Sequence, residues 1–362
     1  MSKYAFIHIA ITDLFLAVEL KENPRLRGLP VIIGTGAEGV KKGDVITASP
    51  EAGALGVRPG MSVRRALKAV PEAIVRPLRH EDSEEMSRGV FDIIGRSFKS
   101  VESFGLSEAF MARALRGAVP EDVSEGYAAA KKEAEAVQGR IRTRLGLHTT
   151  AGVGPNKLIA RLAGLRAGED NIAVVARNEA AAFVKTLPVS SLPGVERAVE
   201  KRLNDLGLGT VEEISKTPLL FLKKNFGSST GAILYESSRA VGSEEIVCFQ
   251  AEEGLCREVA FPGGVSGASL IKETLYRLAV GLAAELKAEA SHASGVAVKV
   301  TYTNFACGVS SLELDEETDS FNSIWAGVTD LLGSTPLSGK IILLGLKLTG
   351  LTKRAGTGGP PR

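Results

Sequence analysis

Residues 8–19 read HIAITDLFLAVE, and this stretch decides the fold class of the chain. Residues 4–11 are almost unbroken apolar, which predicts a buried β-strand that runs directly into a helix. Thr12 or Asp13 can cap that helix, because a short oxygen side chain accepts hydrogen bonds from the free N–H groups of the first turn. An α/β enzyme usually places its chemistry at such a strand–helix junction. Ala10 and its neighbours carry no carboxylate there, so the junction lacks the side chains of a metal site.

Bulk composition indicates an ordinary globular protein. The 362 residues can form two or more cores, and a formal net charge of +2 is too small to argue for nucleic-acid binding by itself. Three cysteines, an odd number without metal-ligand spacing, indicate reduced thiols. The N-terminus has no signal-peptide pattern and no apolar run reaches membrane-spanning length, so we expect a cytoplasmic protein without membrane contact.

The order of predicted elements divides the chain. Strands and helices interleave up to residue 175, which indicates α/β organisation. Helical pieces are predicted over 179–236 and a linker over 237–254. The strand–helix–strand–strand–helix–strand order that follows predicts a compact α+β unit. The Gly- and Pro-rich end, 355–362, is expected to be disordered.

These expectations have the following ranges. Strands are predicted over 4–11, 31–34, 44–48, 148–154, 172–175, 255–261, 295–303, 308–314 and 340–348, with a hairpin over 101–112. Helices are predicted over 13–22, 83–98, 127–145, 157–166, 270–289 and 320–332, and one more helix begins between 61 and 66.

Two motifs that suggest ligands have simpler explanations. GTGAEG at 34–39 matches a dinucleotide-binding pattern, but a strand and not a helix follows, which favours a hairpin loop. HEDSEE at 80–85 gathers metal-capable side chains, yet acidic residues are also favoured at a helix N-terminus. His8, His148 and His292 have no sequence neighbours at ligand spacing.

The segment around Gly194 has the outline of a helix–hairpin–helix. Such hairpins hold DNA phosphates through backbone N–H groups and do not read sequence. Glu196 stands where a second glycine is usual, and its carboxylate would face the phosphate. A helical turn kept for packing is at least as good an explanation as a DNA clamp.

Taken together, these stretches resemble the Y-family DNA polymerases, the translesion enzymes, up to about residue 354. The segments that carry the resemblance are HIAITDLFLAVE (8–19), PRLRGLPV (24–31), LGVRPGM (55–61), LSEAF (106–110), GVGPNK (152–157), LPGV (192–195), VKV (298–300) and KIILLGLK (340–347).

The resemblance implies a multi-domain fold of α/β and α+β parts, the right hand of the Y-family polymerases. It implies a palm over 1–20 and 80–175 with inserted fingers over 21–79. A helical thumb with the helix–hairpin–helix then covers 176–236, and the linker covers 237–254. The βαββαβ little finger covers 255–354, and 355–362 is the disordered tail.

The family's chemistry is nucleotidyl transfer with two Mg²⁺ ions, which three carboxylates hold. The resemblance places these ligands at Ala10, Ser107 and Glu108. One carboxylate cannot hold two divalent ions together with a triphosphate. The resemblance therefore implies a degenerate catalytic site with no metal and no cofactor.

Other family ligands are replaced as well. The positions that grip the triphosphate are Pro50, Gly53 and Gly168, and none offers a cationic or hydroxyl side chain. Several little-finger positions that are basic in the family are neutral here, which would weaken DNA affinity. The residues that remain as candidates for DNA binding are Lys157, Arg161, Gly194, Lys299 and Lys347.

These losses predict a protein that is not an enzyme: a polymerase-like chain without nucleotidyl transfer. It would have an accessory, damaged-DNA-binding or adaptor role in DNA repair and translesion synthesis. Expected partners are primer–template DNA, bound weakly and without sequence preference, and another polymerase or repair protein. One alternative is an active, atypical translesion polymerase that uses Asp13, Glu19 or Glu108. Another is a protein–protein module that no longer binds DNA.

Overall fold

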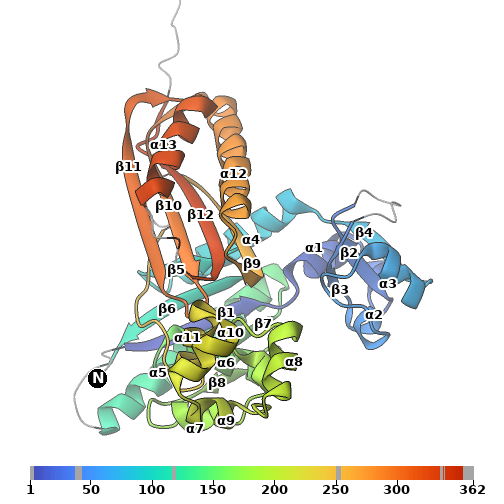
Figure 1. The fold of residues 1–362 in the computed structure, drawn as a ribbon. Coiled ribbons are helices and arrows are strands. Elements are labelled where there is room, and N and C mark those ends of the chain that lie inside the picture. Colours follow the sequence, from blue (N-terminus) through green and yellow to red (C-terminus); the bar gives the residue numbers. More distant parts are fainter. Residues whose placement is uncertain are drawn as a thin grey trace, which may run out of the picture.

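The computed structural model of the chain describes residues 4–36, 43–115, 120–249, 254–334, 337 and 339–353. It contains a five-stranded sheet, a three-stranded sheet and a C-terminal four-stranded sheet with one short extra strand. Figure 1 shows the C-terminal sheet above the five-stranded sheet, a helical segment below it and the three-stranded sheet at the side. In the part of the chain described, no helix is long and apolar enough to cross a membrane.

The five-stranded sheet has the order β5-β6-β1-β7-β8, and β1 is its central strand. Within this sheet, β7 and β8 are parallel, and the other neighbouring strands are antiparallel. The strands are β1 (Tyr4–Ile11), β5 (Val101–Phe104), β6 (Glu108–Ala114), β7 (Thr149–Gly154) and β8 (Ile172–Val174), and the helices are α1 (Leu14–Glu22), α4 (His80–Gly95), α5 (Pro120–Leu145) and α6 (Lys157–Ala167).

The three-stranded sheet lies between α1 and α4 in the sequence, as an insertion. Its order is β3-β2-β4, with β2 antiparallel to β3 and parallel to β4. The antiparallel pair agrees with the hairpin predicted around GTGAEG, although residues 37–42 lie outside the described residues. The elements are η1 (Pro24–Leu26), β2 (Val31–Gly34), β3 (Val45–Ala48), α2 (Pro50–Ala54), α3 (Val63–Ala69) and β4 (Ile74–Pro77).

Short helices follow β8 and pack around their own apolar cluster. They are α7 (Ala180–Lys185), η2 (Val189–Ser191), α8 (Arg197–Asp205), α9 (Val211–Lys216), α10 (Leu219–Phe226) and α11 (Ser228–Ser237). The described residues between α11 and Leu255 form neither helix nor strand, and they lead to the C-terminal sheet.

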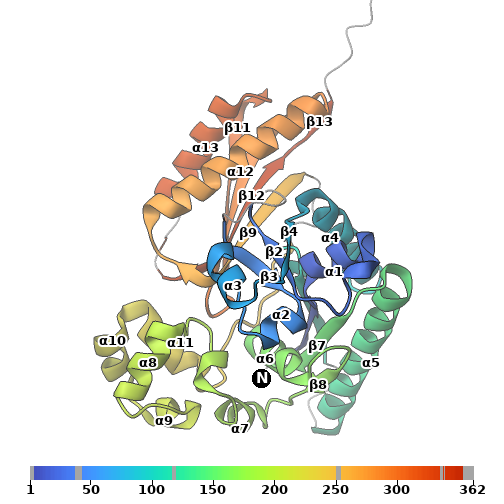
Figure 2. The same ribbon diagram turned by 90° about the vertical axis from the view of Figure 1, so that its right-hand side faces the viewer.

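The C-terminal sheet has the order β11-β10-β12-β9, and the predicted βαββαβ sequence of elements is confirmed. Its two helices cover one face of the sheet and form a second core with it (Figure 2). The elements are β9 (Leu255–Val265), α12 (Ala268–Ala288), β10 (Ser291–Tyr302), β11 (Cys307–Thr318), α13 (Phe321–Ser334), β12 (Ile341–Thr349) and β13 (Thr352–Lys353), which pairs with β10.

The predicted cap of α1 is wrong. Asp13 occupies the N-cap position in the left-handed region, with φ of 46°, and its side chain makes no capping hydrogen bond. Its Oδ1 instead accepts a hydrogen bond of 3.2 Å from the Thr47 hydroxyl on β3. The Thr12 hydroxyl is buried without a hydrogen-bond partner among the described residues. A contact from another element therefore took the place of the local cap.

Four short elements were not predicted, and the helices α4 and α5 begin earlier than expected, α5 at Pro120 and not at residue 127. The elements η1, α2, β4 and β13 are missing from the prediction, although Ser49 followed by Pro50 is a helix-start signal and the Ser49 side chain caps α2. Helix α4 begins at His80, so Glu81 and Asp82 lie in its first turn, where the helix dipole favours acidic side chains. The predicted disordered tail lies outside the described residues.

Candidate active site

Side chains along β1 point alternately to the two faces of the five-stranded sheet. Ile7, Ile9 and Ile11 face the helices α4 and α5 and are buried in the apolar core between these helices and the sheet. His8 and Ala10 point to the opposite face of the sheet, because successive side chains on a strand alternate. Strand register then sets His8 opposite Phe110 and Ala10 opposite Glu108 on β6.

Helix α6 lies close against this second face. A Cβ atom at Gly152 on β7 would lie 2.1 Å from the carbonyl oxygen of Ala160, so only glycine permits the observed approach. Asn156 caps the helix by accepting a hydrogen bond of 2.9 Å from the N–H of Ile159. The close approach brings Arg161 of α6 to Glu108.

Glu108 is the centre of a charged triad with His8 and Arg161. Arg161 binds the carboxylate with two bonds, Nε to Oε2 at 2.7 Å and Nη2 to Oε1 at 3.0 Å. His8 Nε2 lies 2.8 Å from the same Oε2. The His8 side chain is fully buried, whereas Arg161 and Glu108 keep 27% and 17% of their side-chain surface exposed. Both carboxylate oxygens therefore already have cationic or hydrogen-bonding partners.

The triad fixes the charges of its members. Burial alone would raise the pKa of Glu108, but the Arg161 guanidinium and the His8 contact hold it well below its usual range. Burial lowers the pKa of His8, and the nearby Glu108 only partly opposes this effect. Glu108 is therefore anionic and His8 is largely neutral at neutral pH.

The residues around Glu108 do not fit two divalent ions. Ala10 and Ser107 carry no carboxylate, and the oxygens of Glu108 are occupied by Arg161 and His8. Mg²⁺ needs several oxygen ligands in octahedral geometry. The hydroxyls of Thr12 and Thr150 are buried without a partner among the described residues, and Thr150 pairs opposite Ala10. The residues around Glu108 therefore do not supply the ligand set of a two-metal site.

The other two candidate carboxylates are engaged elsewhere. Glu19 is buried in α1 and accepts hydrogen bonds from Arg76 at 2.6 Å and Arg79 at 2.9 Å. Asp13 accepts the Thr47 bond described above. Glu108 is thus the candidate carboxylate that lies on the same sheet face as Ala10.

The predicted triphosphate positions lie on two helices. Pro50 and Gly53 belong to α2, and Gly168 ends α6 with a φ of 80°. A nearby cation is Arg58, whose guanidinium donates to the carbonyl oxygens of Gly53 and Val57. The structure therefore brings a guanidinium to α2, although not from the position that the resemblance selects.

Three of the predicted DNA-binding residues have buried side chains. Lys157 donates to both oxygens of Glu102 at 2.9 Å, and Lys299 donates to Glu258 at 3.0 Å. Lys347 donates to the carbonyl oxygen of Phe249 at 3.0 Å. In this arrangement none of the three presents its ammonium group on the surface, since their exposed fractions are at most 1%.

The predicted helix–hairpin–helix also meets the C-terminal sheet. Gly194 has a φ of 76°, as a tight turn requires, and a Cβ there would be 4.0 Å from Thr303. Glu196, whose carboxylate was predicted to face a DNA phosphate, is paired with Lys340 at 2.6 Å. This turn is held against the segment that leads into β12.

Sequence reasoning missed several partners because they are distant in the chain. His8 was expected to have none, yet Glu108 contacts it. His148 was also expected to have none, but its Nδ1 lies 2.6 Å from Asp170 and 3.2 Å from Glu169. The His148 ring nitrogen and the carboxylate oxygens of Glu169 and Asp170 lie within 4.8 Å of one another. Arg142 also donates a hydrogen bond to Asp170. No spacing in the sequence signals either contact.

Comparison with known proteins identifies the family. Residues 9–164 match the impB/mucB/samB family, 190–241 match the family described as DNA polymerase-iota, thumb domain, and 253–359 match the impB/mucB/samB family C-terminal domain. DNA polymerase IV of Desulfatibacillum aliphaticivorans is 30% identical over 97% of this chain and 86% of that protein. DNA polymerase IV of Methanoculleus marisnigri is 26% identical over 96% of both chains.

Solved structures share the fold. DinB from Sulfolobus solfataricus superposes with a TM-score of 0.65 at 20% identity and covers 97% of this chain and 100% of that chain. An insertion ternary complex of Dbh DNA polymerase gives a TM-score of 0.63 at 20% identity, with the same coverage. The chain belongs to the Y-family DNA polymerases, the DinB/UmuC-like group, and the predicted fold class is confirmed.

The prediction of a protein that is not an enzyme and lacks nucleotidyl transfer is corrected by this comparison. Relatives that match almost the whole chain are named DNA polymerase IV, which is the name of an enzyme. The prediction depended on counting carboxylates at positions carried over from the family. Such a count describes ligands and does not measure activity. The assignment of Ala10, Ser107 and Glu108 as degenerate positions stays a prediction.

Proposed function

We propose that this chain is an atypical translesion DNA polymerase that binds primer–template DNA and adds nucleotides to the primer during DNA repair. The observation that carries the proposal is the end-to-end match with proteins named DNA polymerase IV. The similarity of fold to a polymerase crystallised as an insertion ternary complex supports it. A near-neutral net charge of +2 agrees with weak DNA binding without sequence preference.

The proposal assigns the parts of a polymerase hand to the observed elements. The five-stranded sheet with α1, α4, α5 and α6 would be the palm, in 1–20 and 80–175. The three-stranded sheet would be the fingers in 21–79, the helices α7 to α11 the thumb in 176–236, and the C-terminal sheet the little finger in 255–354.

Within this hand, Glu108 and Arg161 form a charged pair on the face of the palm sheet that packs against α6. A phosphate group binds the two-pronged edge of a guanidinium as a carboxylate does. We infer that a phosphate of the DNA or of the nucleotide competes with Glu108 for Arg161. Such competition would release the oxygens of Glu108 at the reacting end of the primer. Arg161 and Gly194 remain the proposed DNA contacts in the present arrangement, and Lys157, Lys299 and Lys347 would contact DNA only after the C-terminal sheet moves away from the palm.

A primer-extension assay tests the proposal, with a fluorescent primer on a template and each divalent metal, Mg²⁺ or Mn²⁺, supplied in turn. The wild-type chain should extend the primer, and Glu108→Ala and Arg161→Ala should reduce extension strongly. Glu273→Gln is the matched control, because this glutamate is exposed on α12, where it pairs with its helix neighbour Arg277.

A mobility shift at low salt, with the same DNA, separates binding from chemistry. A wild-type chain that shifts the DNA but never extends the primer would overturn the proposed activity. Extension by Glu108→Ala at the wild-type rate would refute the role of Glu108.

A further inference from the structure

The turn that presents Glu108 is held by the C-terminal sheet. Strands β5 and β6 form a hairpin whose turn covers residues 105–107, and Glu108 is the first residue of β6. The turn is also fixed from within the first sheet, since Ile11 N–H donates to the Ser107 carbonyl at 2.7 Å. Its other side faces β9 and β10, which come from a part of the chain 150 or more residues away.

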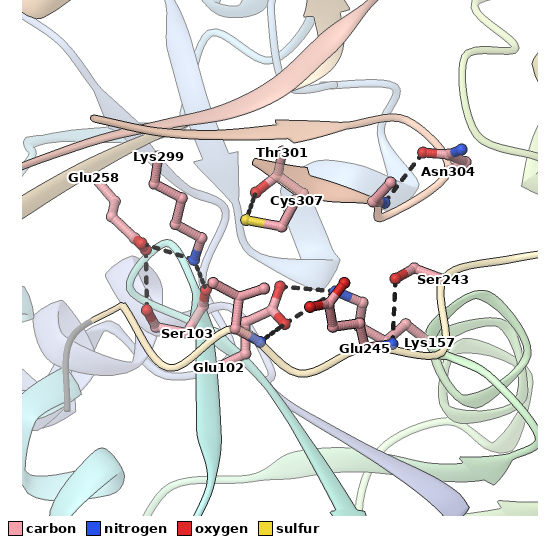
Figure 3. Close-up of polar contacts among 12 residues, drawn as sticks. Glu102, Ser103, Lys157, Ser243, Glu245, Glu258, Lys299, Thr301, Asn304 and Cys307 are labelled. Carbon is pink, nitrogen blue, oxygen red and sulfur yellow. Dashed lines mark hydrogen bonds and ion pairs between the residues drawn. The ribbon is translucent and has the colours of Figure 1, made fainter. Parts of the chain in front are cut away.

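Two buried charges of the C-terminal sheet contact this hairpin, as Figure 3 shows for Glu258, Lys299 and Ser103. Glu258 Oε2 accepts a hydrogen bond of 3.1 Å from the Ser103 hydroxyl and one of 3.3 Å from the N–H of Gly105. Lys299 Nζ donates to the Ser103 carbonyl at 2.9 Å and to Glu258 Oε1 at 3.0 Å. We name Glu258 and Lys299 the hairpin clasp.

The sequence builds the clasp with a glycine. Glu258 on β9 and Lys299 on β10 are not on neighbouring strands, because β12 runs between them, and Gly345 is the β12 residue paired with both. A Cβ at Gly345 would lie 3.2 Å from Glu258 Cγ and 3.3 Å from Lys299 Cβ. The missing side chain therefore lets the two long side chains meet over β12.

The clasp is desolvated only while the two sheets are in contact. Side-chain exposure is 0% for Lys299 and 2% for Glu258. Burying two charges costs solvation free energy, which the mutual attraction repays only when every remaining polar group is bonded. Here the bonds to Ser103 and Gly105 give both charged groups hydrogen-bond partners outside the pair. We expect this buried ion pair to specify one arrangement of its neighbours more than it adds stability.

A second contact supports the same side of the site. Phe305, at the tip of the β10–β11 hairpin, is buried with Phe104 and Phe110 at centroid distances of 5.9 Å and 5.5 Å. The Arg161 guanidinium carbon lies 5.6 Å from the centre of the Phe305 ring. The C-terminal sheet thus contacts both the hairpin that presents Glu108 and the arginine that binds it.

We propose that Glu258 and Lys299 are positioning residues that hold the 105–107 turn, so that docking of the C-terminal sheet sets the position of Glu108. The catalytic consequence rests on the proposed polymerase function, whereas the clasp itself does not. Displacement of the C-terminal sheet would release the turn and the carboxylate together. The sheet would then be part of the active site and not only a surface for DNA.

Hydrogen exchange of the full-length chain, followed by mass spectrometry, tests the clasp without DNA or nucleotide. Lys299→Met should raise amide exchange in 101–110 about tenfold, the effect of losing roughly one hydrogen bond's protection. Arg277→Met, which removes an exposed pair on α12, is the matched control and should leave this exchange unchanged.

The double variant Lys299→Met/Glu258→Met separates the clasp from general stability, because it leaves no unpaired buried charge. It should recover thermal stability relative to Lys299→Met and still show fast exchange in 101–110. Wild-type protection of 101–110 in the double variant would overturn the proposal. An equal rise of exchange in β7 and in the hairpin would also overturn it, since that indicates general loosening.

A kinetic arm reports the catalytic consequence. In primer extension at saturating primer–template, the double variant should lower kcat about tenfold, and its DNA affinity is measured separately because Lys299 is also a proposed DNA contact. An unchanged kcat would contradict the link between clasp and site. If the wild-type chain extends no primer, the polymerase proposal fails alone, because the exchange experiment still decides whether the clasp holds the turn.

Discussion

The ion pair between Lys157 and Glu102 gives the sharpest stability prediction. Lys157 Nζ donates to both carboxylate oxygens at 2.9 Å, and the two side chains are 0% and 1% exposed. Glu102 Oε2 also accepts a hydrogen bond of 2.8 Å from the N–H of Val247 in the segment before the C-terminal sheet. Lys157→Met keeps the length of the side chain and leaves Glu102 as an unpaired buried charge.

The burial of this ion pair sets the loss of stability expected for Lys157→Met. Removing one partner of a buried pair costs about 3–5 kcal/mol. Each kcal/mol moves the midpoint by about 2–4 °C for a domain of this size class, so Tm should fall by roughly 6–20 °C. The double variant Lys157→Met/Glu102→Met buries no charge and should recover most of the loss. It would retain a deficit of about 1–3 kcal/mol, because Val247 N–H loses its acceptor.

Thermal unfolding at neutral pH, followed by far-UV circular dichroism, measures these shifts. Lys131→Met is the control, since Lys131 and Glu135 form an exposed pair on α5 that should contribute less than about 1 kcal/mol. The reasoning is refuted if Lys157→Met shifts Tm no more than the control does. It is also refuted if the double variant is less stable than the single one.

Three further predictions use other parts of the chain. Gly152→Ala should lower the free energy of unfolding in urea by more than about 3 kcal/mol, because its Cβ would lie 2.1 Å from a backbone oxygen of α6. Gly139 in α5 has open space around it, so Gly139→Ala should stabilise the chain by roughly 0.5–1 kcal/mol. Similar unfolding midpoints for the two variants would contradict this prediction. Burial raises the pKa of Cys256 to about 12. In alkylation at pH 8, followed by mass spectrometry, this thiol should therefore react far more slowly in the folded chain than in urea. Equal reaction rates would show that the thiol is not buried. Phe305→Ala should weaken the contact between the C-terminal sheet and the five-stranded sheet by about 3–5 kcal/mol, and proteolysis within 237–254 should become faster. An unchanged cleavage rate would contradict this prediction.

Local patterns in the sequence were enough for most of the elements. The apolar run of residues 4–11 predicted the central strand, and the alternation of elements after 255 predicted the βαββαβ order. Short elements were missed, because four residues such as those of β4, which end in Pro77, carry too little periodicity to stand out. The cap of α1 failed because Thr47, distant in the sequence, binds Asp13.

The site was harder to predict, for a physical reason. Sequence patterns could locate Glu108 on a hairpin, but not the Arg161 and His8 that bind it, since these contacts span 53 and 100 residues. Lys299 lies on a strand, where alternation assigns it to a face of the sheet. The sequence could not indicate that another part of the chain covers that face, so it does not reveal that Lys299, a predicted DNA contact, is paired with Glu258 in this arrangement.

The measurement that tests the central proposal most directly is single-nucleotide incorporation by the full-length chain. The chain would be bound to four primer–templates that differ only in the templating base, with Mg²⁺ or Mn²⁺ present. The account predicts that each template directs incorporation of its complementary nucleotide, and that Glu108→Ala abolishes incorporation while the DNA remains bound. Bound DNA without incorporation on any of the four templates by the wild-type chain would contradict it.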